Sequence, residues 1–192
     1  MNSIFNYFDK FLPLSEEARK LVLSTVLLVN VSKGTVLVNQ GKANTDFYII
    51  KKGIARGYYL QNGIEVTSTL WQENEVFGDV ITYISLLPAT KSYQVLEDSV
   101  LYKINIARFR ALFEINLEIA NMARIMVEKY IMKQENEKKR DRDMTASERF
   151  QVFITERPEL IHRVKSIHIA SFLTMTPETF SRVHARWTRK NS

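Results

Sequence analysis

The sequence predicts an α+β fold: a β-rich N-terminal part, a long helix and a small helical C-terminal part. Short strand-like runs separated by glycine or asparagine fill residues 26–104, which is typical of a β domain. Helical periodicity then continues to about residue 139. The stretch 166–189 has the pattern of two short helices joined by a tight turn.

The N-terminal part should begin with a helix from Ser15 to Val22, because Ser15 can cap it and two acids follow in the first turn. Asn62-Gly63 predicts a tight hairpin, since both residues accept the positive φ angles of a type I′ turn. Short strands at this spacing are typical of a sandwich or barrel. The expected strands are 26–31, 47–50, 55–60 and 100–104.

The long helix should begin at Ile106, with Asn105 as its cap, and continue after a kink. Its apolar residues step by four, three and four positions, which is the spacing of a coiled-coil seam. Such a stripe either packs on its own domain or pairs with a second copy. The length of the helix and the charged run 133–143 favour a parallel homodimer. The expected interface residues are Ile115, Ile119, Met122, Ala123 and Met126.

The C-terminal part opens with a capping-box spacing from Thr145 to Glu148, and its first helix should stop before Pro158. The last helix has an apolar face and an arginine-rich face, which suits bidentate contacts to guanine edges and phosphates. An ordinary solvated surface helix remains the alternative. The candidate DNA-contacting residues are Thr176, Glu178, Thr179, Arg182, Arg186, Arg189 and Lys190.

Composition narrows the function classes. The 192 residues carry a net charge of +6 and no cysteine, which removes disulfides and iron–sulfur clusters and fits a cytoplasmic location. No apolar run approaches the ~20 residues that span a bilayer, so no membrane partner is expected. The sequence has no phosphate-binding loop and no His-Glu-x-x-His motif, so we expect no enzyme, cofactor or metal. Its last 36 residues, 157–192, are basic, which suits a polyanion.

The order of these parts resembles the Crp/Fnr superfamily of bacterial transcription regulators. Four local patterns carry the resemblance: 47–53, 75–79, 95–101 and 176–182. The resemblance implies a double-stranded β-helix, or jelly-roll-like β-roll, then a dimerisation helix and a helix-turn-helix domain. It places the domains at 1–113, 114–142 and 143–192.

The family's cyclic-nucleotide site uses a glutamate on the ribose and an arginine on the phosphate. Here the glutamate position holds Asp79, and the arginine position falls at Ala89 or Thr90. Lys91 is the only cation near it, and a lysine lacks the bidentate fork of arginine. We therefore expect an effector other than cyclic AMP, with the 77–79 turn retained as scaffold. The candidate pocket residues are Phe77, Gly78, Asp79 and Lys91.

The sequence thus predicts a homodimeric regulator that binds double-stranded DNA at a palindromic operator. Its β-roll would relay the signal of an unknown small-molecule effector through the paired long helices to the last helices. The resemblance also implies RNA polymerase as a partner. A second hypothesis is a sensory or scaffolding protein that binds a partner protein through the β-roll, with a degenerate DNA module.

Overall fold

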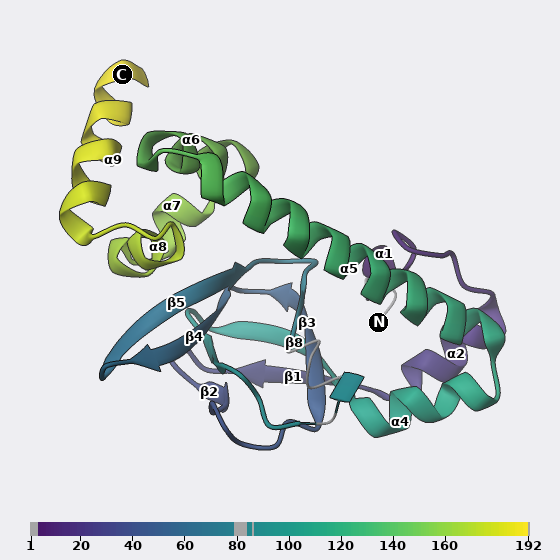
Figure 1. The fold of residues 1–192 in the computed structure, drawn as a ribbon. Coiled ribbons are helices and arrows are strands. Elements are labelled where there is room, and N and C mark those ends of the chain that lie inside the picture. The colour runs from purple at the N-terminus through teal and green to yellow at the C-terminus, as the bar shows by residue number, and fades with distance from the viewer. Residues whose placement is uncertain (1–3, 79–83, 86, 192) are drawn as a thin grey trace.

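A computed structural model describes residues 4–78, 84–85 and 87–191, without the side chains of residues 136–142, 190 and 191. Two antiparallel sheets form a β-roll, a long helix crosses above it, and a cluster of helices lies at one end (Figure 1). The α+β prediction is confirmed. Among the described residues, no helix combines the length and apolar character needed to traverse a bilayer.

The roll consists of two four-stranded sheets in the described part of the chain, with strand orders β1-β8-β3-β6 and β2-β7-β4-β5. All their pairings are antiparallel. The strands are β1 (Val26–Val31), β2 (Val36–Val38), β3 (Asp46–Lys52), β4 (Ala55–Gln61), β5 (Ile64–Trp71), β6 (Val76–Phe77), β7 (Ser92–Val95) and β8 (Ser99–Asn105).

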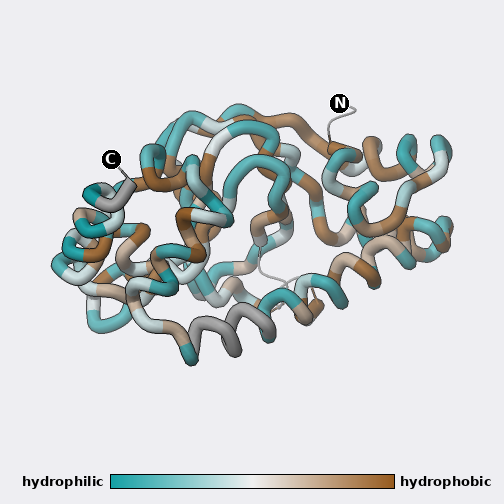
Figure 2. The backbone as a smooth tube through the Cα atoms, turned by 90° about the horizontal axis from the view of Figure 1, so that it is seen from above, coloured by the Kyte–Doolittle hydropathy of each residue, from teal (hydrophilic) through white to brown (hydrophobic). Residues whose placement is uncertain are grey.

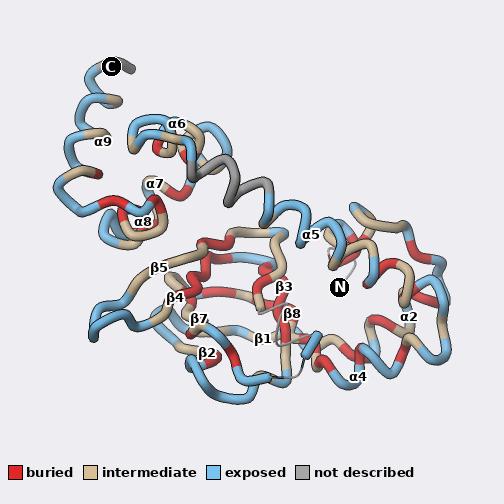
Figure 3. Tube along the Cα trace, viewed as in Figure 1, coloured by how far each residue is buried: buried red, intermediate tan, exposed pale blue. Residues whose placement is uncertain are grey.

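Strand β3 shows how the core is divided, because successive side chains of a strand point to opposite faces. Tyr48 and Ile50 lie in the cluster between the two sheets, together with Phe77. Phe47 and Ile49 lie in a second cluster, which helices cover. Both faces of β3 are therefore buried, and Figure 3 shows buried residues along the inner strands of the roll.

Two turns of the roll depend on glycine. The predicted Asn62-Gly63 hairpin is present between β4 and β5, with φ angles of 53° and 79°. Gly53 has a φ of 119°, and a Cβ added there would lie 2.1 Å from the hydroxyl oxygen of Ser99. Only glycine fits this second turn, because it has both an unusual φ angle and no room for a side chain.

Helices cover the β1-β8-β3-β6 sheet and form one core with it. The predicted N-caps are present: Ser15 accepts from Ala18 N–H at 3.3 Å, and Asn105 from Arg108 N–H at 3.0 Å. The kink predicted within the long helix is a break, after which Asn116 caps a new helix. These helices are α1 (Phe5–Phe8), α2 (Glu16–Leu23), α4 (Ile106–Ala111), the 3₁₀ turn η2 (Leu112–Glu114) and α5 (Leu117–Asp143).

Residues 145–191, here called the C-terminal helical unit, begin with the predicted capping box between Thr145 and Glu148. Their first helix ends before Pro158, as its sequence predicts. The unit lies at the end of the molecule opposite α1, α2 and α4 (Figures 1 and 2). Its helices are α6 (Ala146–Glu156), α7 (Leu160–Arg163), α8 (Ser166–Phe172) and α9 (Pro177–Asn191).

Candidate functional site

The joint between α8 and α9 is short and tightly bonded. The N–H of Met175 donates to the carbonyl of Ala170 at 2.8 Å, which closes the C-terminus of α8. Thr174 lies between them with a φ of 54°, a left-handed conformation that lets the chain reverse. Thr176 then accepts from the N–H of Thr179 at 3.2 Å and caps α9, with Pro177 in the first helical position. The two helices fit a helix-turn-helix, as the sequence predicts.

The apolar face of α9 holds it to the unit. Phe180 is buried, and Val183 and Trp187 are partly buried in the same cluster. The ring of Phe150 from α6 meets Phe180 edge-on at 5.7 Å and Trp187 at 6.1 Å between centroids. His184 lies among these rings, 5.7 Å from Phe180, so it is a core-edge residue. This packing fixes which face of α9 points to solvent.

The opposite face of α9 is exposed and basic. Arg182 reaches back to donate to the hydroxyl of Thr179 at 3.2 Å. Hydrogen bonds from its own backbone N–H and from Thr176 lower the pKa of Glu178, so this carboxylate stays charged. Among the described residues, no carboxylate lies within ion-pair distance of the three α9 arginines. The exposed candidates are Thr176, Glu178, Arg182, Arg186 and Arg189, and Thr179 is half-buried; the side chain of Lys190 lies outside the described residues.

The C-terminal helical unit is docked on the roll, and we call this contact the docking interface. Ile54 and Leu70 of the roll belong to the same buried cluster as the core of the unit. Helix α8 lies along β5, where the N–H of Thr67 donates to the hydroxyl of Ser171 at 2.8 Å. The two parts therefore share a continuous apolar core.

A buried arginine of the roll reaches across this interface. Arg56 is only 3% exposed and pairs with Glu65 of the neighbouring strand. One of its guanidinium nitrogens lies 3.1 Å from Nδ1 of His168 on α8. Burial, and then the charge of Arg56, lower the pKa of His168. The neutral imidazole can accept from the guanidinium, whereas a protonated one would repel it.

Two arginines of the unit bind carboxylates of the roll. Arg157 pairs with Glu75 through both carboxylate oxygens, at 3.0 and 3.2 Å. Arg163 pairs with Glu73 in the same way, at 2.6 and 3.1 Å, and also with Glu97. Burial alone would raise the pKa of Glu73. Hydrogen bonds from Arg163 and from the N–H of Gly53 outweigh the effect of burial and lower this pKa. These pairs are partly shielded from solvent and hold the unit in one orientation.

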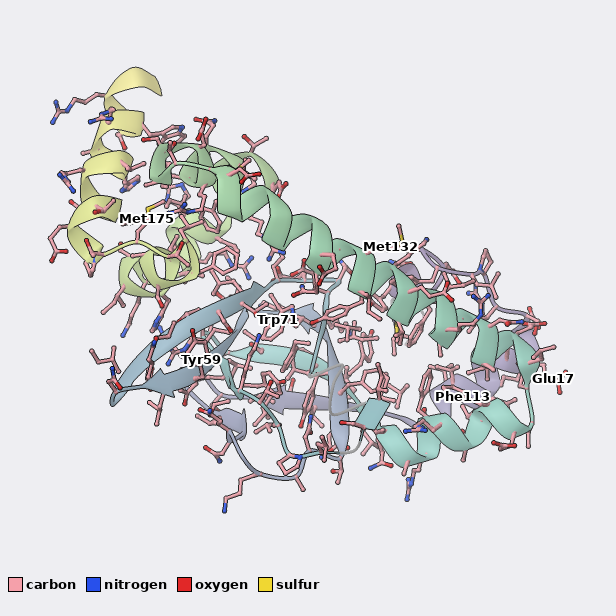
Figure 4. All side chains as sticks on the ribbon, viewed as in Figure 1. Glu17, Tyr59, Trp71, Phe113, Met132 and Met175 are labelled. Atoms are coloured by element: carbon pink, nitrogen blue, oxygen red, sulfur yellow. The ribbon has the colours of Figure 1, made fainter. Side chains whose placement is uncertain are left out.

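Three of the five residues of the predicted dimer seam are buried within the chain itself. Ile119 and Met122 are 0% exposed and Ala123 is 3% exposed, because α1, α2 and α4 of the same chain cover them. Met126 is partly buried against the same cluster, and Ile115 precedes α5 and is exposed. The stripe therefore belongs to the core of the chain. Figure 4 instead shows Met132 on the side of α5 that faces away from the roll.

The predicted pocket residues separate in the structure. Phe77 is fully buried and stacks on Tyr48 at 5.0 Å, so it is scaffold and cannot contact a ligand. Gly78 is half-buried, and a Cβ there would lie 3.2 Å from that of Phe47. Asp79 lies outside the described residues. Of the three described candidates, Lys91 alone lines the main cavity. Of the two candidate arginine positions, Ala89 is 2% exposed and Thr90 is exposed.

This main cavity, of about 480 Å³, lies between β5, α5 and the C-terminal helical unit. Its walls include Trp71 and Thr69 from β5, Tyr130 from α5 and Phe153 from α6. The docking interface thus forms one side of the cavity. Among the described residues, no group of three metal-ligating side chains is present.

Sequence reasoning missed the whole docking interface. The acids Glu73, Glu75 and Glu97 flank turns or strand ends, where charged residues are common. Only Arg56 carried a signal, because it lies in an otherwise apolar strand and is therefore expected to have buried partners.

Comparisons with known proteins agree with this architecture. Residues 28–116 match the cyclic nucleotide-binding domain family. FixK2 from Bradyrhizobium japonicum is 16% identical, with 86% of each chain covered and a TM-score of 0.75. The catabolite activator protein of Thermus thermophilus is 19% identical, with 94% of this chain and 87% of that chain covered and a TM-score of 0.58. DNR from Pseudomonas aeruginosa is 19% identical, with 98% and 87% covered and a TM-score of 0.57.

No curated protein matches the sequence. At identities this low, the solved structures show a shared fold. They confirm the expected fold, in which a β-roll is followed by a long helix and a C-terminal helical unit.

Proposed function

We propose that this chain, which contains a cyclic nucleotide-binding domain and has the fold of Crp/Fnr-type regulators, is a homodimeric, sequence-specific DNA-binding transcription regulator. It would bind DNA in the cytoplasm and would catalyse no reaction. The division into domains at 1–113, 114–142 and 143–192 is part of this proposal.

The observation that carries the proposal is the exposed arginine face of α9. Phe180 and its neighbours hold the back of the helix against α6, so the front projects from a rigid support. Arg182 lies about one turn into the helix, where a recognition helix contacts base edges. Arg186 and Arg189 follow along the same face and suit phosphates or flanking bases. Among the described residues, no carboxylate lies within ion-pair distance of these three arginines, which leaves their guanidinium groups available to a polyanion.

The effector proposal excludes cyclic AMP. A cyclic phosphate in this fold needs a close cation, because burying its charge is costly without one. Ala89 is buried in the required position, and backbone bonds from Ala89 to Lys42 and from Gly41 to Ala89 fix the two loops there. Neither Ala89 nor Thr90, the two candidate arginine positions, offers a guanidinium.

We place the proposed dimer contact on the outer face of α5, the side that faces away from the roll. Leu117 and Ile131 are 75% and 49% exposed and lie two heptads apart, so they share one face of the helix. Met132 is 65% exposed beside them. A second copy of α5 would cover these side chains, whereas no described segment of this chain does.

The assembly test uses light scattering. Ile131→Glu should yield monomers, because a buried charge at a helix seam is unfavourable. Leu28→Glu changes an equally exposed apolar residue on β1 and should leave the dimer intact. A dimer that survives Ile131→Glu combined with Leu117→Glu would show that α5 is not the interface.

The functional test is selection of bound sequences from a random DNA pool. A two-fold symmetric dimer should select palindromes with half-sites about one helical turn, ~34 Å, apart. Arg182→Ala should change the selected sequence, whereas Arg108→Ala, at an exposed arginine on α4, should not. Failure to enrich any sequence would favour the partner-binding alternative.

A further inference from the structure

Helix α8 contacts the roll through one face, which carries His168 and Ser171 (Figure 1). These residues are three positions apart, so they are neighbours on the helix surface. The hydroxyl of Ser171 accepts from the N–H of Thr67 at 2.8 Å and donates to the carbonyl of the same residue at 3.4 Å. His168 lies 3.1 Å from the guanidinium of Arg56. The same face of α8 therefore makes one contact that cannot titrate and one that can.

The guanidinium of Arg56 is fixed by acceptors of the roll. Nε donates to Gln94 at 2.8 Å, Nη1 donates to the hydroxyl of Thr67 at 3.3 Å, and Nη2 pairs with Glu65. The group also lies 4.2 Å from the ring centre of Tyr58. The arginine is buried, so turning it away would leave these partners without their bonds. A positive charge on the neighbouring imidazole would therefore meet a cation that is held in place.

Among the described residues, two cations and one carboxylate act on the imidazole of His168. Arg56 faces it from β4, Glu65 faces it from β5, and Lys165 lies at the start of α8. The carboxylate is already bonded to the guanidinium, so it compensates a second cation only weakly. The neutral ring can accept the guanidinium N–H, whereas a protonated ring has no acceptor. Protonation would thus replace a hydrogen bond by two like charges 3.1 Å apart across the docking interface.

The ion pair of Arg163 does not respond to protons in the same pH range. Its partner Glu73 has a lowered pKa, because hydrogen bonds from Arg163 and from a backbone N–H outweigh the effect of burial. Carboxylates ordinarily titrate near pH 4 and imidazoles near pH 6.5. Acidification from about pH 7.5 to 5.5 therefore acts on the α8 contact and leaves the Arg163 contact charged.

We propose that His168 and Arg56 form a pH-sensitive switch, which holds α8 on β5 at neutral pH and releases it when the imidazole is protonated. This switch goes beyond the proposed function, because it needs neither DNA nor a small molecule.

The sign of the pH dependence follows from linkage. The ring of released α8 has the ordinary pKa of about 6.5, and docking lowers the pKa, because burial and the charge of Arg56 disfavour the imidazolium. Protons therefore bind the released state more tightly. The docked state should be fully populated by its other contacts above about pH 6.5 and should lose stability below it. One proton can raise the released population about tenfold at most at pH 5.5.

The test uses NMR on the full chain. The ring signal of His168, identified by its loss in His168→Asn, should titrate with a pKa below the ordinary 6.5. The amide of Thr67 reports the release of α8, because it bonds to Ser171. Its protection factor, which corrects for the pH dependence of chemical exchange, should fall about three- to tenfold from pH 7.5 to 5.5. The protection factor of Tyr48, in the roll core, should change less than about twofold.

Two asparagine variants separate the switch from other effects of acid. In His168→Asn the amide oxygen can replace Nδ1 as the acceptor for Arg56 and does not titrate, so Thr67 should keep its protection at pH 5.5. His162→Asn removes an exposed histidine of α7 and should keep the response of the unaltered chain. A response that persists in His168→Asn would refute the role of this imidazole. If His168→Asn does not fold, the ring titration and the Thr67 protection of the unaltered chain decide.

Three results in the unaltered chain would also overturn the proposal. A His168 pKa at or above 6.5 would mean that the ring turns to solvent while α8 stays docked. A Thr67 protection factor that stays constant while the ring titrates would mean that the interface accepts the proton without opening. Equal losses of protection at Thr67 and Tyr48 would mean that acid destabilises the whole chain.

Discussion

Replacing Arg163 tests whether the ion pairs hold the C-terminal helical unit on the roll. Arg163 is bonded to Glu73 and Glu97, and each of these three side chains is about 30% exposed. Arg163→Met removes one cation and leaves two carboxylates facing each other. We expect the docked arrangement to lose about 1–2 kcal/mol, above the median for exposed pairs because the pairing is bidentate. That loss increases the undocked population about five- to thirtyfold.

The readout is hydrogen exchange at the amide of Thr67. This N–H donates to Ser171 across the docking interface, so undocking exposes it without unfolding the roll. Its exchange should accelerate about five- to thirtyfold in Arg163→Met. The amide of Tyr48, in the roll core, should be unaffected.

Arg124→Met is the matched control, because Arg124 also pairs with a glutamate, Glu128 at 2.6 Å, but on the exposed side of α5. It should leave Thr67 unchanged. Equal acceleration at Thr67 and Tyr48 in Arg163→Met would mean global destabilisation. Acceleration below twofold at Thr67 would refute the ionic contribution to docking.

Three further predictions follow from single residues. Arg182→Ala should cost about 1–3 kcal/mol in DNA-binding free energy and relax the preference at one base position. Arg189→Ala should weaken binding to all sequences alike and reduce the salt dependence by about one phosphate contact. Titrations of single-base variants of the DNA at two salt concentrations distinguish the two outcomes. Since the folded-state pKa of His168 is lowered, the unfolded chain binds this proton more tightly, and stability should fall as pH drops below about 6.5. A thermal-unfolding series from pH 8 to 5 should show a shallower slope for His168→Gln, and identical slopes would contradict the pairing. Gly53→Ala should destabilise the chain by about 1–3 kcal/mol, because its φ is positive and its Cβ would meet Ser99; an unchanged melting temperature would show that the turn relaxes at no cost.

Local features of the fold could be predicted from the sequence because their causes are local. Ser15, Asn105 and Thr145 cap helices through bonds to residues three positions later, and such bonds are visible in the sequence. The Asn62-Gly63 turn depends on two adjacent φ angles. The order of the parts also followed from such local patterns, whereas the topology of the β-roll came from the resemblance.

The seam of α5 shows where periodicity stops being informative. The stripe containing Ile119 and Met122 is real, but a heptad pattern gives only the face of a helix and not the neighbour that covers it. Here α1, α2 and α4 cover it, and their apolar residues lie close to those of α5 only after folding. The ion pairs are equally hidden, since Arg163 and Glu73 are 90 residues apart.

The docking interface also changes the expected path of the signal. A relay through paired long helices needs a second chain, whereas β5 of the roll already contacts α8 within one chain. Trp71, at the end of β5, lines the cavity, and Thr67 on the same strand bonds to Ser171 of α8. Helix α8 in turn positions α9 through the bonded turn at Met175. A ligand that moves β5 therefore acts on the exposed arginines through one packed layer, and variants that undock the unit should uncouple the ligand from DNA while leaving the dimer intact.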